Sequence, residues 1–250
     1  MKQVLSALLL VIVVSAQKDR ITLAQKPEAA NGQIKGGEAI LTPKSPVLQR
    51  LNDAQSMSRI DQMDFIGEAA VTLQTDKGPI TVPVKVIRSQ GGQRIIFNQS
   101  DGKPWDGNLL HLEPLSRRVL EFVQTEFARG VQNIMKAPIR NAVVSDEGSK
   151  NGSQILSLRE TTGATTRYSL DASSSRVMRM EFQREKSNPG KTERASNVET
   201  YNFSDFRSIN GVATPFKVEH YTNGSLQERM DFTSIKYLTN SIPSSRGPRQ

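Results

Sequence analysis

A mainly β fold of the α+β class is predicted by this sequence: a curved antiparallel half-barrel of about eleven strands, covered by two or three helices. Long stretches alternate apolar and polar residues with a period of two, which turns one face of each stretch toward a core. Asn-Gly and similar turn sequences separate these stretches, as hairpins require. One long stretch with helical spacing interrupts them and would cover the apolar face of the sheet.

One short helix and four strands are expected before that long helix. Leu48 and Leu51 recur at helical spacing and predict a helix that begins at Pro46 and ends near Ile60. Pro83 has no N–H group to donate, so its strand is expected at an edge or a bulge of the sheet. The four strands are expected at residues 63–74, 80–86, 93–98 and 107–113.

The stretch from Leu115 to Met135 predicts an amphipathic helix. Large apolar residues recur at every fourth position, and the arginines and glutamates between them stay off that stripe. Pro138 follows and ends the helix, whereas Gly130 weakens it locally.

Seven further strands are expected after the long helix. The last three form a meander between Val198 and Leu238, with tight turns at Asn210-Gly211 and Asn223-Gly224. Strands of ten or more residues reach beyond about 30 Å, which suits a curved sheet. The other four strands are expected at residues 140–146, 154–160, 166–171 and 177–184.

The C-terminal hairpins resemble those of a known superfamily. The run from Asn202 to Phe216 reads Asn-Phe-Ser-Asp-Phe-Arg-Ser-Ile-Asn-Gly-Val-Ala-Thr-Pro-Phe, and the run from Met230 to Lys236 reads Met-Asp-Phe-Thr-Ser-Ile-Lys. Both runs are similar to hairpins of periplasmic proteins in the outer-membrane lipoprotein carrier superfamily. The resemblance implies a half-open antiparallel barrel with helices over its mouth. It also implies periplasmic transport or sensing of lipoproteins or other lipids without covalent chemistry, and it assigns no individual functional residue.

The chain divides into four expected segments. Residues 1–16 have a charged start, an apolar core too short to span a bilayer and a small-residue end, so they are expected to be a secretory signal peptide. Residues 17–45 are expected to be a flexible linker, 46–240 the half-barrel domain, and 241–250 a disordered tail. We therefore expect a bacterial protein, periplasmic or secreted, that is a soluble monomer after cleavage near Ala16.

Few residues offer chemistry. The sequence has no cysteine, which excludes disulfides and thiolate sites, and two histidines, His111 and His220. The histidines lack the spacing of a metal pair, and no Gly-x-Ser-x-Gly elbow is present, so both are interpreted as residues on a strand face. We expect no enzyme, no cofactor and no metal, with an unrecognised hydrolase as the weakest alternative. The formal net charge of +8 is spread along the chain, which favours anionic surfaces such as phospholipid head groups over nucleic acid.

The leading functional hypothesis is the binding and transport of a lipid or lipoprotein acyl chain. If the sheet curls incompletely around the 115–135 helix, an apolar cavity remains, and burial of a chain there gains about 0.8 kcal/mol per CH₂. The same residues would otherwise form an ordinary core. The alternative is an interaction or sensory module that binds a protein partner through the half-barrel, and an outer- or inner-membrane protein is a candidate partner. The candidate cavity residues are Phe65, Val84, Phe97, Leu120, Phe122, Phe127, Met180, Phe216 and Phe232.

Overall fold

A computed structural model describes residues 39–41, 45–56, 63–89, 92–98, 105, 112–130, 132–185 and 196–239 of the 250-residue chain. Eleven strands in these ranges form one antiparallel sheet. Their bounds are β1 (Ala39–Ile40), β2 (Met63–Leu73), β3 (Ile80–Ser89), β4 (Gly92–Phe97), β5 (Val143–Lys150), β6 (Ser153–Arg159), β7 (Thr165–Asp171), β8 (Val177–Glu185), β9 (Ser196–Ile209), β10 (Val212–Thr222) and β11 (Ser225–Thr239).

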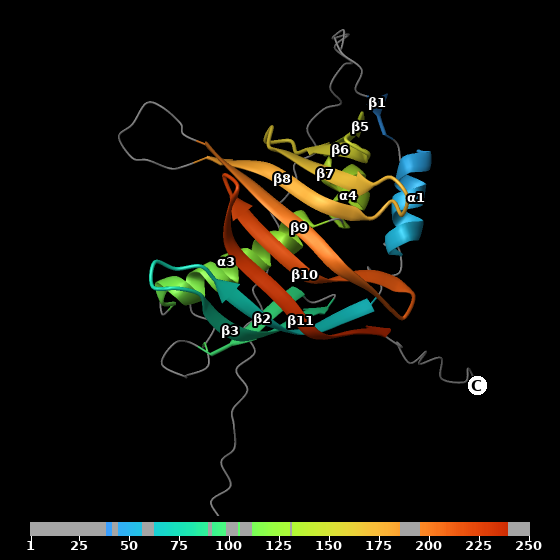
Figure 1. Cartoon of the computed structure of the whole chain (residues 1–250). Coiled ribbons are helices and arrows are strands. Elements are labelled where there is room, and N and C mark those ends of the chain that lie inside the picture. Colours follow the sequence, from blue (N-terminus) through green and yellow to red (C-terminus); the bar gives the residue numbers. More distant parts are fainter. Residues whose placement is uncertain are drawn as a thin grey trace, which may run out of the picture.

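The sheet is curved and does not close on itself within the described part of the chain. Its strand order is β1-β5-β6-β7-β8-β9-β10-β11-β2-β3-β4, and the two end strands, β1 and β4, do not pair with each other. Figure 1 shows the sheet bending around one side of the molecule. The predicted fold class, a curved antiparallel half-barrel with helices, is confirmed.

Ten of the strands lie where alternation predicted them. The expected strand at residues 107–113 falls largely outside the described residues, and its last two, Leu112 and Glu113, are not in a strand. The eleventh strand is instead the two-residue β1, which pairs with β5 and lies within the segment expected to be a linker. The strand expected at 140–146 begins later, at Val143, because Ala137–Arg140 form a 3₁₀ turn, η2.

Two helices accompany the sheet, and both are shorter than predicted. Helix α1 (Pro46–Gln55) ends before Ser56, which adopts a left-handed conformation with φ of 50°. Helix α3 (Pro114–Arg129) ends at Gly130, and a separate turn, α4 (Gln132–Met135), follows. The continuous helix expected from Leu115 to Met135 is therefore wrong, because Gly130 takes an extended conformation with ψ of 171°. A Cβ atom at Gly130 would lie 2.7 Å from the carbonyl oxygen of Glu126.

Helix α3 crosses the concave side of the sheet (Figure 1). Arg118, near its start, contacts β11 and the carbonyl group of Gln74 just after β2, whereas Arg129, at its end, contacts Thr166 on β7. Helix α1 lies next to β10, near the turn that joins β9 to β10, where Oγ of Ser56 donates to the carbonyl oxygen of Gly211. The concave face is thus covered by one helix, and its rim is partly covered by the other.

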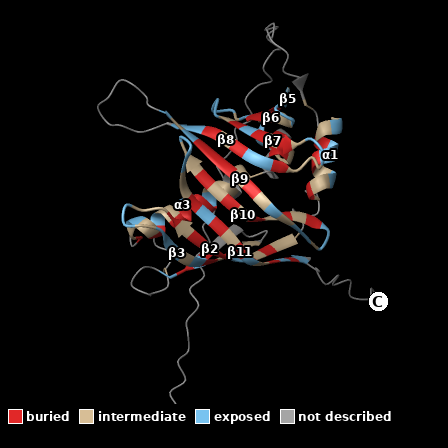
Figure 2. Cartoon of the chain, viewed as in Figure 1, coloured by how far each residue is buried: buried red, intermediate tan, exposed pale blue. Residues whose placement is uncertain are grey.

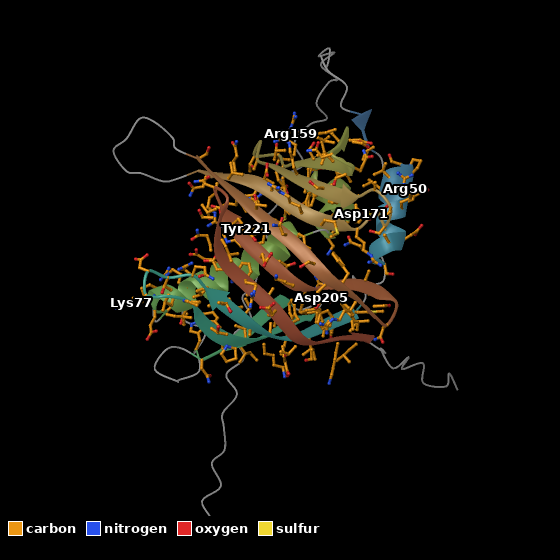
Figure 3. The ribbon with its side chains drawn as sticks, in the orientation of Figure 1. Arg50, Lys77, Arg159, Asp171, Asp205 and Tyr221 are labelled. Carbon is orange, nitrogen blue, oxygen red and sulfur yellow. The ribbon has the colours of Figure 1, made fainter. Side chains whose placement is uncertain are left out.

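Burial alternates along the strands as the period-two pattern requires. Figure 2 shows buried and exposed bands alternating on β9 and β10, and every second residue of β10 from Val212 to His220 is buried. Figure 3 shows labelled charged side chains, including Arg50, Lys77 and Asp205, projecting from the outside of the molecule. The apolar residues accordingly gather on the concave side.

Two β-bulges determine which side chains of β11 face inward. A register shift between Phe232 and Ser234 leaves no residue of β2 opposite Thr233, so Phe232 and Ile235 both lie on the concave face despite their odd spacing. A second shift lies opposite His220, where the strand skips Gln227 and pairs His220 with Glu228. The second bulge brings a carboxyl group to the inside of the sheet.

Candidate functional site

Helix α3 presses an apolar stripe into the concave face. Val119, Leu120, Phe122 and Val123 are each at most 3% exposed. The helix begins with a proline at its first position, where no intrahelical N–H bond is lost. Its polar residues Arg117, Glu121 and Gln124 remain exposed on the outer side.

The structure places eight of the nine candidate cavity residues in one buried cluster. The ring centroids of Phe65 and Phe232 lie 6.0 Å apart, edge to face, and Phe97 stacks on Trp105 at 5.4 Å. The side chain of Phe127 lies outside the described residues. The buried candidates are Phe65, Val84, Phe97, Leu120, Phe122, Met180, Phe216 and Phe232.

Gly67 makes room for the aromatic pair. A Cβ atom at this position would lie 2.7 Å from the ring of Phe232 and 2.8 Å from that of Phe65, closer than carbon atoms approach. The ring centroid of Tyr237 on β11 lies 5.7 Å from that of Phe65 on β2. The hydroxyl group of Tyr237 lies 3.1 Å from the hydroxyl group of Thr214. These rings fill one end of the concave face.

A buried histidine and two glutamates form the polar part of the site. Nδ1 of His220 on β10 lies 2.5 Å from Oε2 of Glu228 on β11, and its Nε2 lies 2.8 Å from Oε2 of Glu199 on β9. All three residues are at most 8% exposed. A carboxylate only accepts hydrogen bonds, so both ring nitrogens can donate only when the imidazole carries both protons. Both ring nitrogens of His220 thus lie within hydrogen-bond distance of a buried carboxyl group.

Arg118 joins this histidine–glutamate group to helix α3. Its Nε and Nη2 donate to Oε1 of Glu228 at 3.0 and 2.6 Å, and its Nη1 donates to the carbonyl oxygen of Gln74 at 3.0 Å. Burial acts to raise the pKa of Glu228, but hydrogen bonds from His220 and Arg118 outweigh it, so the pKa is lowered. Glu228 is thus held by Arg118 at one carboxyl oxygen and by His220 at the other.

A second arginine fastens the other end of α3. Nη1 of Arg129 donates to Oγ1 of Thr166 at 3.0 Å, and its guanidinium lies 4.1 Å above the ring centroid of Phe182. The hydroxyl group of Tyr168 donates to the carbonyl oxygen of Arg129 at 2.7 Å, and burial raises the pKa of this tyrosine. Helix α3 is thus attached to the sheet near both ends by polar side chains.

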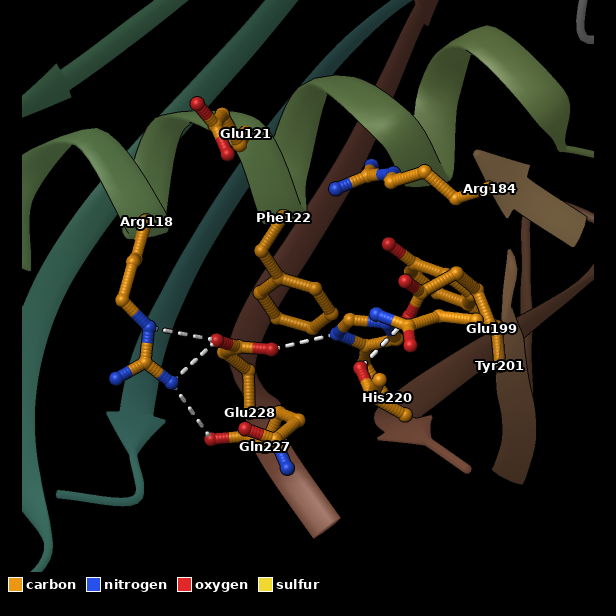
Figure 4. A pocket seen from close by; sticks show the side chains of 11 residues that line it. Arg118, Glu121, Phe122, Arg184, Glu199, Tyr201, His220, Gln227 and Glu228 are labelled. Atoms are coloured by element: carbon orange, nitrogen blue, oxygen red, sulfur yellow. Dashed lines mark hydrogen bonds and ion pairs between the residues drawn. The ribbon is translucent and has the colours of Figure 1, made fainter. Parts of the chain in front are cut away.

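A pocket of about 250 Å³ opens between α3 and strands β8 to β11 (Figure 4). Stacked rings form one wall, because Tyr201 lies 4.5 Å and Phe122 lies 6.0 Å from the ring of His220. Arg184 and Glu121 also line this pocket, and both are exposed. Phe122 is the candidate cavity residue that lines it, so the pocket reaches the apolar core at this ring.

Glu126 places a further carboxyl group on the inner half of α3. Burial raises its pKa to about 7, against the opposing effect of Arg88. Burial also raises the pKa of Tyr237, and of the charges near this hydroxyl group Arg88 lowers its pKa whereas Glu126 raises it. A polar group therefore lies near the end of the concave face that Phe65 and Tyr237 fill.

The histidine–glutamate group is not arranged to bind a metal ion. Glu199 and Glu228 contact opposite nitrogens of the same ring, so their oxygens do not converge on one point. No cluster of three or more His, Cys, Asp or Glu side chains suitable for a metal was found in the described ranges. None of the helices in the described part of the chain has the length and apolar character needed to span a bilayer.

The sequence analysis placed His220 correctly on a strand face but did not identify its partners. Glu199 and Glu228 lie 21 and 8 residues away in the sequence, on different strands. The tight turn at Asn223-Gly224 fixes the pairing of β10 with β11 only up to the bulge, and His220 lies beyond it, so the turn gave no signal for Glu228. His111 lies outside the described residues.

Comparison with known proteins finds similarity at the level of structure. No family model matches the sequence, and no curated protein matches it. The chain is similar to a DUF1329 family protein from Desulfovibrio piger, with 10% identity, a TM-score of 0.46 and coverage of 78% of this chain and 94% of that one. It is also similar to a putative outer membrane lipoprotein-sorting protein domain from Vibrio parahaemolyticus, with 13% identity, a TM-score of 0.46 and coverage of 78% and 94%.

A LolA superfamily protein from Nitrosomonas europaea is similar as well, with 12% identity, a TM-score of 0.45 and coverage of 76% of this chain and 91% of that one. The names of the second and third of these proteins are those of the superfamily that the C-terminal hairpins resemble.

Proposed function

We propose that this protein binds the acyl chain of a lipid or lipoprotein between the concave face of the sheet and helix α3, and carries it in the periplasm without covalent chemistry. One observation supports this function above the others. A helix with an apolar stripe covers the apolar face of an unclosed sheet, and polar side chains near its two ends attach it. A helix held in this way can leave the sheet without disrupting any strand pair.

Ligand exchange in this proposal depends on movement of α3. The buried candidate residues belong to one cluster formed by the concave face of the sheet and the apolar stripe of α3. An acyl chain enters as α3 moves outward and takes over the apolar contacts of this helix. Each CH₂ group transferred from water gains about 0.8 kcal/mol, which offsets the contacts that the helix gives up. The direction of transfer then follows from the difference in affinity between donor, carrier and acceptor.

The first test is binding of an apolar ligand by the wild-type protein. Native mass spectrometry after bacterial expression is expected to detect co-purified lipid. After delipidation, the uncharged fluorescent probe N-phenylnaphthylamine is expected to bind with a rise in fluorescence. A delipidated protein that binds no probe would contradict the proposed function.

The second test fills the proposed space from a single strand. Ala69 on β2 is buried on the concave face, whereas its neighbour Ala70 points to the opposite face and is only partly buried. Ala69→Phe is expected to reduce probe binding, and Ala70→Phe, which adds the same ring outside, is expected to leave it unchanged. If Ala69→Phe does not fold, Ala69→Val adds less volume at the same position. Equal binding by the folded Ala69 variant and the Ala70 variant would contradict a site on the concave face.

The third test prevents α3 from moving. The natural sequence has no cysteine, so the double substitution Arg118→Cys and Glu228→Cys introduces a unique pair that a short bis-maleimide can link. The linked protein is expected to take up the probe more slowly than the same variant before linking. Identical uptake rates would show that α3 need not move.

A further inference from the structure

We propose that the pocket beside α3 binds a zwitterionic head group, with its ammonium at Glu199 and its phosphate or carboxylate at Arg184. This inference rests on the proposed function, because it assigns the polar end of the ligand whose chain lies under α3. Phe122 lines the pocket and also belongs to the buried core, so the pocket and the core meet at its ring. A single amphipathic molecule can therefore occupy both.

Deep in the pocket, one carboxylate oxygen, Oε1 of Glu199, is available to a ligand. Both oxygens of Glu228 are occupied, one by Arg118 and the other by His220. Glu199 is 3% exposed, and its Oε2 accepts from Nε2 of His220 and from the hydroxyl group of Thr222. Its Oε1 has no donor among the described residues. A buried carboxylate accepts several hydrogen bonds, so an N–H donor from a ligand would complete its set.

Arg184 supplies the opposite charge at the mouth of the pocket. Its guanidinium makes one contact in the described structure, a long hydrogen bond of 3.5 Å from Nη2 to Oγ1 of Thr125. No carboxylate pairs with it there. In Figure 4 the side chain extends along α3 toward the pocket. A guanidinium has five N–H donors in a fixed fork that matches phosphate and carboxylate oxygens, so Arg184 retains donors for an anionic group.

Charge complementarity favours a zwitterion over either simple ion. An anion alone would lie near three carboxyl groups, those of Glu121, Glu199 and Glu228, whereas a cation alone would lie near Arg118 and Arg184. A ligand that carries both charges can place each one against its opposite. The volume of about 250 Å³ lies just below the range of about 300–1,000 Å³ for pockets that hold a drug-sized molecule, so it suits a head group.

The test compares lipids that share their acyl chains and differ in their head groups, presented in detergent micelles. Phosphatidylethanolamine has the phosphate and an ammonium with N–H donors, phosphatidylcholine has an ammonium without N–H donors, and phosphatidylglycerol has no ammonium. We expect phosphatidylethanolamine to bind about tenfold more tightly than the other two, as the loss of one charged hydrogen bond implies. Water-soluble glycerophosphoethanolamine, tested by calorimetry, shows whether the site also binds the free head group.

Three variants locate the effect. Arg184→Gln and Glu199→Gln are each expected to remove the preference for phosphatidylethanolamine. Arg184→Gln is also expected to leave N-phenylnaphthylamine binding within twofold of wild type. Arg184 is exposed, so its variant remains informative if the Glu199 variant does not fold. Arg179→Gln serves as the matched control, because Arg179 lies on the same strand but outside the pocket.

The results separate this inference from the function on which it rests. Probe binding without any head-group preference, or a preference that survives both pocket variants, would overturn the head-group site and leave acyl-chain binding intact. Loss of probe binding in the wild-type protein would overturn both.

Discussion

Glu126 on α3 is expected to make the stability of the protein depend on pH. Its carboxyl group lies on the inner half of α3, partly buried, and burial raises its pKa from 4.5 to about 7 despite the opposing charge of Arg88. An acid with a raised pKa in the folded state keeps its proton there after the unfolded chain has released its own. The carboxyl group therefore costs stability as the pH rises from about 4.5 to about 7, and the cost is constant above that range.

The size of the effect follows from the two pKa values. A change from 4.5 to about 7 corresponds to a free energy of about 3 kcal/mol, at about 1.4 kcal/mol for each pH unit. Glutamine has nearly the shape of the protonated carboxyl group and cannot ionise. Glu126→Gln is therefore expected to leave the free energy of unfolding almost unchanged at pH 4 and to increase it by up to about 3 kcal/mol at pH 8.

Urea denaturation of both proteins between pH 4 and pH 8 measures this difference directly. Glu121→Gln is the matched control, because Glu121 is exposed on the same helix, and exposed substitutions change stability by about 0.5 kcal/mol or less. A difference between Glu126→Gln and wild type that does not grow with pH would refute the burial argument. A variant less stable than wild type at pH 8 would show that the ionised carboxylate makes a favourable contact.

Three further substitutions test the attachment of α3 and the aromatic packing on the concave face. Glu228→Gln is expected to lower the free energy of unfolding by about 3–5 kcal/mol at pH 7, as loss of one partner of a buried ion pair does. This difference should shrink as the pH falls through the acid range, because the pKa of Glu228 is lowered in the folded wild-type protein. Denaturation measured at several pH values checks both expectations. Gly67→Ala is expected to lower stability by about 1–3 kcal/mol through its clash with the ring of Phe232, and Phe232→Leu should restore part of the loss in a double-mutant cycle. Arg129→Lys keeps the charge but loses the flat contact with Phe182, so the melting temperature should fall, and an unchanged value would argue against that contact.

The strands were predictable because each signal was local. Alternation assigned the faces of β2 and β10 correctly, and Asn210-Gly211 and Asn223-Gly224 form the turns that their residue types predicted, with positive φ at both positions of each. The end of α3 was harder to predict, since a glycine inside a helical pattern weakens a helix by only about 1 kcal/mol. The extended conformation of Gly130, rather than its propensity, ends the helix.

The polar site was not predictable by the same route. A regular hairpin after Asn223-Gly224 would place His220 opposite Gln227, with Glu228 on the outer face. The bulge adds one residue to β11 and pairs His220 with Glu228 instead. Glu199 reaches the ring from the next strand, β9, through a register that the sequence alone does not reveal. The site therefore depends on how the three strands pair, which the residue types alone do not reveal.

The side chains that attach α3 to the sheet are compatible with the proposed movement of this helix. A buried ion pair gains little net stability, because the desolvation of its charges offsets most of their attraction, whereas apolar side chains in the same space often hold more firmly. Arg118 and Glu228 nevertheless specify one position for α3, since a shifted helix would leave a buried carboxylate without its donor. Polar attachment near the two ends of an apolar stripe thus favours a single closed position of α3 without making it the most stable packing available, which is what the proposed exchange of an acyl chain needs.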